Sequence, residues 1–124
     1  MSFLFENPYV ALWSHAFVFT LGVELVVATP LLSASGASRW RRMAAVAVAN
    51  VASHPAVWFI IPELHLGNTA SLVLSESWAV LLELGIYLLV FPSLGKRRAA
   101  VTSLAANAAS FGLGLVVRSL TGWV

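Results

Sequence analysis

The sequence predicts an all-α membrane protein, a bundle of four transmembrane helices built from two tandem helical hairpins. Three observations predict it: four long apolar segments, two clusters of basic residues between them, and a repeat that relates the two halves of the chain. The 124 residues are 60% hydrophobic and only 10% charged, with a mean hydropathy of +0.89. Because soluble domains carry about 25% charged residues, this composition indicates a membrane protein.

Each of the four apolar segments is long enough to cross the hydrocarbon core of a bilayer, which takes about 20 helical residues. The predicted spans are 11–32, 43–61, 72–91 and 99–117, within a single transmembrane domain, 1–124. The segments are rich in Ala and Leu and lack the alternation of a membrane-spanning strand. We therefore expect four helices whose main partner is the lipid bilayer.

All Lys and Arg residues except Arg118 fall in two loops, 33–42 and 93–98. The positive-inside rule places such loops in the cytoplasm. We therefore expect a multi-pass protein of a bacterial plasma (inner) membrane, with both termini and the middle loop outside. The same topology explains the sequence pI of about 9.7, so no nucleic-acid partner is predicted.

The second and fourth segments resemble each other. Residues 41–55 read RRMAAVAVANVASHP, and residues 98–112 read RAAVTSLAANAASFG. At one fixed offset an Arg, an Asn and a Ser coincide. Two hairpins of the same orientation form a parallel repeat, which predicts a pseudo-two-fold axis along the membrane normal.

One polar residue of each segment lies at nearly the same depth. At a rise of about 1.5 Å per residue, Glu24, Asn50, Glu83 and Asn107 each lie roughly 12–14 Å from the predicted cytoplasmic boundary. Inserting an ionisable group at this depth costs about 2.5–3.5 kcal/mol, so these side chains should face the bundle interior. A desolvated carboxyl favours its neutral form, in which it can donate to an Asn carbonyl. We call these four residues the polar layer.

Other polar side chains share the same helix faces and extend the predicted ion- or substrate-binding site. Pro55 removes a backbone hydrogen bond and disfavours helical geometry at the residue before it, close to the layer. The additional candidates are Ser53, His54, Glu76, Tyr87 and Ser110.

The chemistry of the layer favours binding over packing alone. Gln could make structural hydrogen bonds without a titratable group, so Glu at both Glu24 and Glu83 favours a proton- or cation-binding pair. Asn50 and Asn107 are expected to be hydrogen-bond partners of that pair. No catalytic residue and no cofactor are predicted, and the absence of cysteine excludes thiol chemistry and cysteine-based metal sites.

The leading hypothesis is a small membrane transporter or channel subunit. A homodimer is plausible as well, because four helices enclose little space. The second is a non-catalytic assembly or accessory protein, whose polar layer only sets helix register. The third is an intramembrane metal-dependent enzyme, since oxygen and nitrogen ligands could bind a divalent metal. The ligands for such a metal would be Glu24, His54, Glu76 and Glu83.

The order Glu24, N-x-x-S-x-P at 50–55, Glu83 and N-x-x-S at 107–110 resembles a group of small, uncharacterised bacterial membrane proteins with four helices. This resemblance spans nearly the whole chain and implies no activity. The size and the first Glu are also similar to small multidrug resistance transporters, from which the second Glu and the two Asn motifs depart. The chain is the size of a fluoride channel subunit but lacks the motifs of that family.

Overall fold

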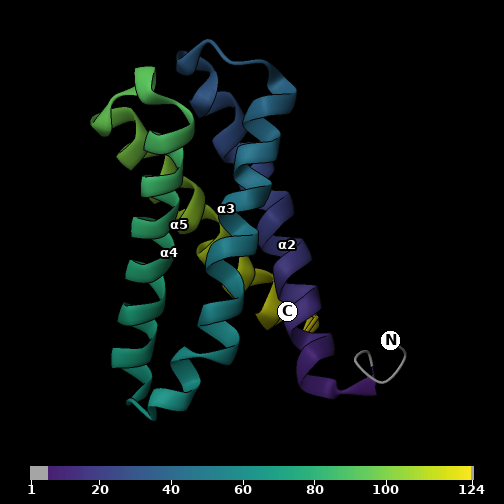
Figure 1. Cartoon of the computed structure of the whole chain (residues 1–124). Coiled ribbons are helices and arrows are strands. Elements are labelled where there is room, and N and C mark those ends of the chain that lie inside the picture. Colours follow the sequence, from purple (N-terminus) through teal and green to yellow (C-terminus); the bar gives the residue numbers. More distant parts are fainter. Residues whose placement is uncertain (1–5, 124) are drawn as a thin grey trace.

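Four long α-helices make up almost the whole of the computed structural model, which describes residues 6–123 (Figure 1). No strand occurs among these residues, and each of the 4 helices is long and apolar enough to cross a membrane. The predicted all-α four-helix bundle is therefore confirmed. The helices are α2 (Pro8–Leu31), α3 (Arg39–Phe59), α4 (Asn68–Val90) and α5 (Lys96–Thr121).

The helices form a ring of four neighbours. Helix α2 packs against α3 and α5, and α4 packs against the same two helices. The hairpin α2–α3 therefore lies beside the hairpin α4–α5, with α3 and α5 at opposite corners. The small buried residues Ala45, Ala49, Ala99 and Ala106 lie on α3 and α5, which allows these helices to approach their neighbours closely.

Each helix begins three or four residues before the apolar segment that predicted it, while α2, α3 and α4 end one or two residues before that segment does. Helix α3 begins at Arg39 instead of residue 43 because the Ser38 hydroxyl accepts a hydrogen bond from the Arg41 backbone N–H, at 3.2 Å, and so caps the helix. The side chain of Asn7 caps α2 in the same way. Hydropathy marks the apolar span, whereas caps and polar first turns decide where a helix begins. Helix α3 also continues through Pro55, as the predicted span 43–61 implied, so the backbone stays helical although the proline cannot donate a backbone hydrogen bond.

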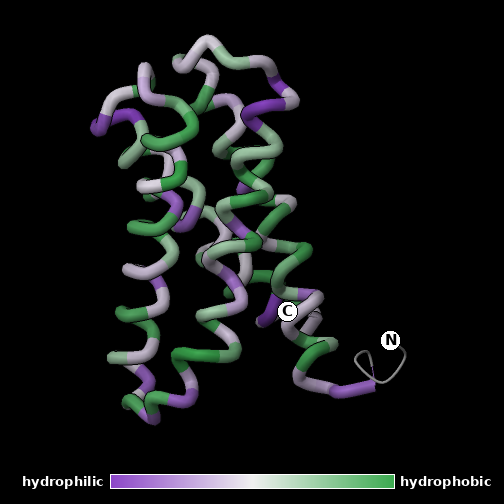
Figure 2. The backbone as a smooth tube through the Cα atoms, in the orientation of Figure 1, coloured by the Kyte–Doolittle hydropathy of each residue, from purple (hydrophilic) through white to green (hydrophobic). Residues whose placement is uncertain are grey.

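Short loops define two ends of the bundle. The basic end contains the 3-10 turns η1 (Leu32–Ser35) and η3 (Pro92–Leu94) with the basic residues that follow each of them. The far end contains η2 (Ile61–Leu64), the start of α2 and the end of α5. Figure 2 shows hydrophilic residues at both ends and mostly apolar residues along the helices between them.

Two arginines join the hairpins at the basic end. Arg41 of α3 donates Nη2 to the carbonyl of Val90, the last residue of α4, at 3.1 Å, and Arg98 of α5 donates Nε to the carbonyl of Leu31, the last residue of α2, at 2.9 Å. Each arginine thus satisfies a carbonyl that a helix C-terminus leaves free, where positive charge is also favoured. Because Arg41 and Arg98 are equivalent in the repeat, each half of the chain makes the same contact with the other half. We call this pair of contacts the arginine clasp.

Removing the arginine clasp should loosen the two hairpins. We expect the double variant Arg41→Gln/Arg98→Gln to lose about 1–3 kcal/mol of stability, since each charge-assisted bond at an exposed site contributes about 0.5–1.5 kcal/mol. The thermal unfolding midpoint of the purified protein in detergent measures this loss. The control is Arg39→Gln/Arg97→Gln, which removes the same charge from the same loops. Equal midpoints for the two double variants would contradict the clasp.

Candidate functional site

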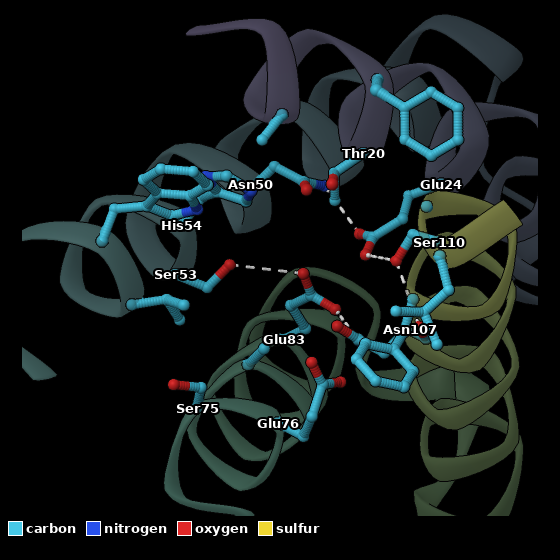
Figure 3. A pocket seen from close by; sticks show the side chains of 18 of the residues that line it. Thr20, Glu24, Asn50, Ser53, His54, Ser75, Glu76, Glu83, Asn107 and Ser110 are labelled. Atoms are coloured by element: carbon cyan, nitrogen blue, oxygen red, sulfur yellow. Dashed lines mark hydrogen bonds between the residues drawn. The ribbon is translucent and has the colours of Figure 1, made fainter. Parts of the chain in front are cut away.

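The carboxyl groups of Glu24 and Glu83 meet in the middle of the bundle. Glu24 is 0% exposed and Glu83 is 1% exposed, and the two side chains point toward each other from α2 and α4 (Figure 3). Both carboxyls line the same cavity, and each accepts hydrogen bonds from neighbouring Asn and Ser side chains. The polar layer predicted from depth alone is therefore a set of side chains in contact.

Each carboxyl accepts a hydrogen bond from the Asn of its own hairpin. Asn50 donates Nδ2 to Oε2 of Glu24 at 2.8 Å, and Asn107 donates Nδ2 to Oε2 of Glu83. The same amide nitrogens also donate to the backbone carbonyl four residues earlier on their own helices, at 2.9 Å in both cases. Both amide groups therefore have one possible orientation, because exchanging O and N would place an acceptor against two other acceptors.

Each carboxyl also accepts a hydrogen bond from the Ser of the other hairpin. Ser53 donates Oγ to Oε1 of Glu83 at 3.4 Å, and Ser110 donates Oγ to Oε1 of Glu24 at 3.3 Å. Trp78 donates Nε1 to the backbone carbonyl of Ser53 at 3.1 Å, a further bond between α3 and α4. Each Glu is thus bound by Asn from its own hairpin and by Ser from the other, as the two-fold repeat requires.

A cavity of about 220 Å³ lies directly on the polar layer. On every helix its lining residues extend from the layer toward the far end, and none lies on the basic side of the layer. Carboxyl, amide and hydroxyl groups form its floor (Figure 3). The lining residues fall within 16–24 of α2, 50–58 of α3, 75–83 of α4 and 107–118 of α5.

The walls of the cavity are largely apolar and partly aromatic. Phe19, Trp58 and Phe111 line it above the floor, while Glu76 and Arg118 lie closer to the far end. Glu76 is one of the predicted site residues, whereas the aromatic walls were not predicted from the sequence. In a membrane helix apolar residues face lipid and cavity alike, so hydropathy gives no signal for which aromatic side chains line a pocket.

The basic side of the layer is closed by packed side chains. Leu32 and Val46 are 0% exposed and Phe91 is 2% exposed. Tyr87, a predicted site residue, lies among them, fully buried and outside the cavity lining. Its hydroxyl has no hydrogen-bond partner within the described part of the chain. The bundle is therefore open toward one end and filled at the other.

His54 forms part of the cavity wall and does not reach the carboxyl pair through a hydrogen bond. Its Nδ1 accepts a hydrogen bond from Nε1 of Trp13 at 3.1 Å. Its ring packs edge-on against Phe17, with centroids 5.5 Å apart, and is stacked beside Trp58. This environment orients the imidazole toward the aromatic residues between α2 and α3.

The four candidate metal ligands share one cavity without forming a metal-binding cluster. Glu24, His54, Glu76 and Glu83 all line it. Between residues 6 and 123, however, no group of three or more His, Asp or Glu side chains is arranged to hold a metal ion. The arrangement instead supplies carboxyl, amide and hydroxyl oxygens at the floor of the cavity.

Comparisons of the chain with protein-family models, with curated proteins and with solved structures give no match. Function is therefore inferred from the geometry and chemistry of the site itself.

Cysteine accessibility tests whether the cavity admits water. The chain contains no native cysteine, so single cysteines can be introduced without further changes. We expect Ala79→Cys, on the cavity lining, to react with a charged, membrane-impermeant thiol reagent when the protein is in lipid nanodiscs. The matched variant Ala28→Cys, at a residue that is 0% exposed on the basic side, should be at least about tenfold slower because only the thiolate in water reacts readily. Equal rates would contradict a cavity open at one end.

Proposed function

We propose that this protein is a small membrane transporter or channel subunit that binds a proton or a small cation at Glu24 and Glu83. The observation that carries the proposal is the position of the carboxyl pair, at the floor of a cavity that opens toward one end of the bundle and is closed toward the other. Intramembrane carboxyls that face a cavity mark ion pathways by default. Sites at the interface of two structural repeats are typical of transporters.

The proposed orientation places the basic end in the cytoplasm of a bacterial plasma (inner) membrane, by the positive-inside rule. Both chain ends and the cavity mouth then face outward, and the arginine clasp lies on the cytoplasmic side. In this orientation the bundle is in an outward-open state. Transport would require the hairpins to part at the clasp and close over the cavity, in the manner of rocking repeats.

A homodimer is part of the proposal. The cavity described above is small, and large apolar side chains such as Val26 (74% exposed) and Leu89 (81% exposed) lie on the outer surface. Lipid covers most of such a surface, and a second copy would cover the remainder.

The role of the carboxyl pair is tested by flux into proteoliposomes. A pH-sensitive dye inside the vesicles reports proton entry under an imposed membrane potential, and radioactive Na⁺ and K⁺ report cation entry. We expect Glu24→Gln and Glu83→Gln each to lower the flux of the transported ion at least about tenfold, since each removes an ionisable group from the pathway. Glu63→Gln, at an exposed loop residue of the far end, is the control and should retain flux. Undiminished flux in both buried variants, or no flux of any of the three ions, would refute the proposal.

A second candidate function, a non-catalytic assembly or accessory protein, is favoured by the reciprocal bonds from Ser53 and Ser110 across the hairpins. In that case the polar layer sets helix register and nothing more. The two candidates differ in what the variants do. An assembly role predicts that the Gln variants fold and behave as the natural protein does, while Ala at Asn50 or Asn107 destabilises the bundle.

A further inference from the structure

The polar layer contains more hydrogen-bond acceptors than donors. Four donor groups, from Asn50, Ser53, Asn107 and Ser110, each bind a different oxygen of the two carboxyls. The second N–H of each Asn is used by its own helix. When both carboxyls are ionised, no donor of the layer therefore remains for the amide oxygens.

The amide oxygen of Asn50 is the clearest unfilled position. Asn50 is 1% exposed, and its Oδ1 has no hydrogen-bond partner within residues 6–123. Rotating the amide does not help, because Nδ2 is held by Glu24 and by a backbone carbonyl. Because Oδ1 belongs to the same small group as Nδ2, it lies beside the Glu24 carboxyl (Figure 3). A buried acceptor without a partner is unfavourable and calls for an explanation.

We propose that the polar layer is a binding site for one alkali metal cation, which is coordinated by Oδ1 of Asn50 together with carboxyl oxygens of Glu24 and Glu83. The equivalent amide oxygen of Asn107 completes the set from the second hairpin. The inference rests on the proposed function and deepens it by naming the class of ion. It also gives the two Asn residues a second role, since Nδ2 donates a hydrogen bond to a carboxyl while Oδ1 coordinates the ion.

The charge of the layer suits a monovalent ion. Two carboxyls supply at most two negative charges, and each of their oxygens already accepts a hydrogen bond from a neutral donor. Ca²⁺ takes six to eight oxygens, commonly including bidentate carboxylates, and Mg²⁺ keeps several waters in strict octahedral geometry. An alkali ion can instead exchange its hydration shell for carbonyl and carboxyl oxygens.

The cavity supplies the route to this site. Its volume of about 220 Å³ holds several waters, since one water occupies about 30 Å³ of liquid. A hydrated ion can therefore enter from the far end and lose water at the floor. The closed packing on the basic side, which includes Phe91 and Val46, leaves the site accessible from one direction.

Equilibrium binding of radioactive ²²Na⁺ to the purified protein in lipid nanodiscs tests the proposal without requiring transport. The natural sequence should bind Na⁺ saturably, with a single site per chain. Unlabelled Na⁺ or Li⁺ should displace the label, whereas choline and tetramethylammonium should not at the same concentration. These competition measurements need no variant and so do not depend on a variant folding.

Two variants test which side chains coordinate the cation. Asn50→Leu, which keeps the volume but removes the amide oxygen, and Glu83→Gln should each weaken Na⁺ binding about 10- to 100-fold, the range for losing one interaction with a charged group. Ser103→Ala is the matched control, because Ser103 is buried one turn from Asn107 but donates to the backbone carbonyl of Val80 at 2.8 Å. It should bind Na⁺ as the natural sequence does. Circular dichroism verifies that each protein is folded.

The proposal is overturned if the folded natural protein has no saturable Na⁺ site, if Ca²⁺ displaces the label at lower concentration than Na⁺, or if tetramethylammonium competes as well as Na⁺. Affinity unchanged in both Asn50→Leu and Glu83→Gln would also overturn it. Proton flux that depends on the Glu pair, without Na⁺ binding, would retain the transporter and remove the alkali site. Na⁺ binding without flux of any ion would retain the site and remove transport.

Discussion

Burying two carboxyl groups at membrane depth is the constraint on which the rest of this structure depends. A carboxyl in hydrocarbon is unfavourable unless donors surround it, and lipid supplies none. The four donors that reach Glu24 and Glu83 come from α3 and α5, and half of them cross from one hairpin to the other. The carboxyls can therefore be satisfied only when both hairpins are present and in register.

Each of the two hairpins supplies hydrogen-bond donors to the buried carboxyls with the same types of residue. At the depth of the layer, Asn and Ser from each half complete a carboxyl, and at the basic end Arg41 and Arg98 each cap a helix of the other half. The two sets of contacts lie at different heights in the bundle, and each is made once by each half of the chain. Between them the interior is filled, and beyond the layer it opens into the cavity. The proposal of ion transport rests on this difference between the two ends of the bundle and not on the fold class.

Much of the fold could be predicted because the length and hydropathy of a membrane helix can be recognised in the sequence. The shared depth of the four layer residues followed from counting the helical rise, and the repeat indicated that Asn50 and Asn107 are equivalent. The partners across the hairpins could not be derived, since Ser53 and Ser110 lie on the expected faces whichever carboxyl they bind. Tyr87 was predicted in the site by its spacing from Glu83, yet spacing cannot tell on which side of the layer the cavity lies. The arginines were predicted as topological markers, and only the packed loops indicate that two of them also bind carbonyls.

The most direct test of the central claim is a double-mutant cycle between Ser110 and Glu24, read as the free energy of unfolding in mixed micelles. The account predicts that Ser110→Ala and Glu24→Leu, which removes the acceptor oxygen, are coupled by about 0.5–3 kcal/mol, as expected for residues in one hydrogen-bond network, because their hydrogen bond joins the two hairpins. Effects that add within about 0.3 kcal/mol, the behaviour of independent sites, would contradict a carboxyl layer shared between the two halves of the chain.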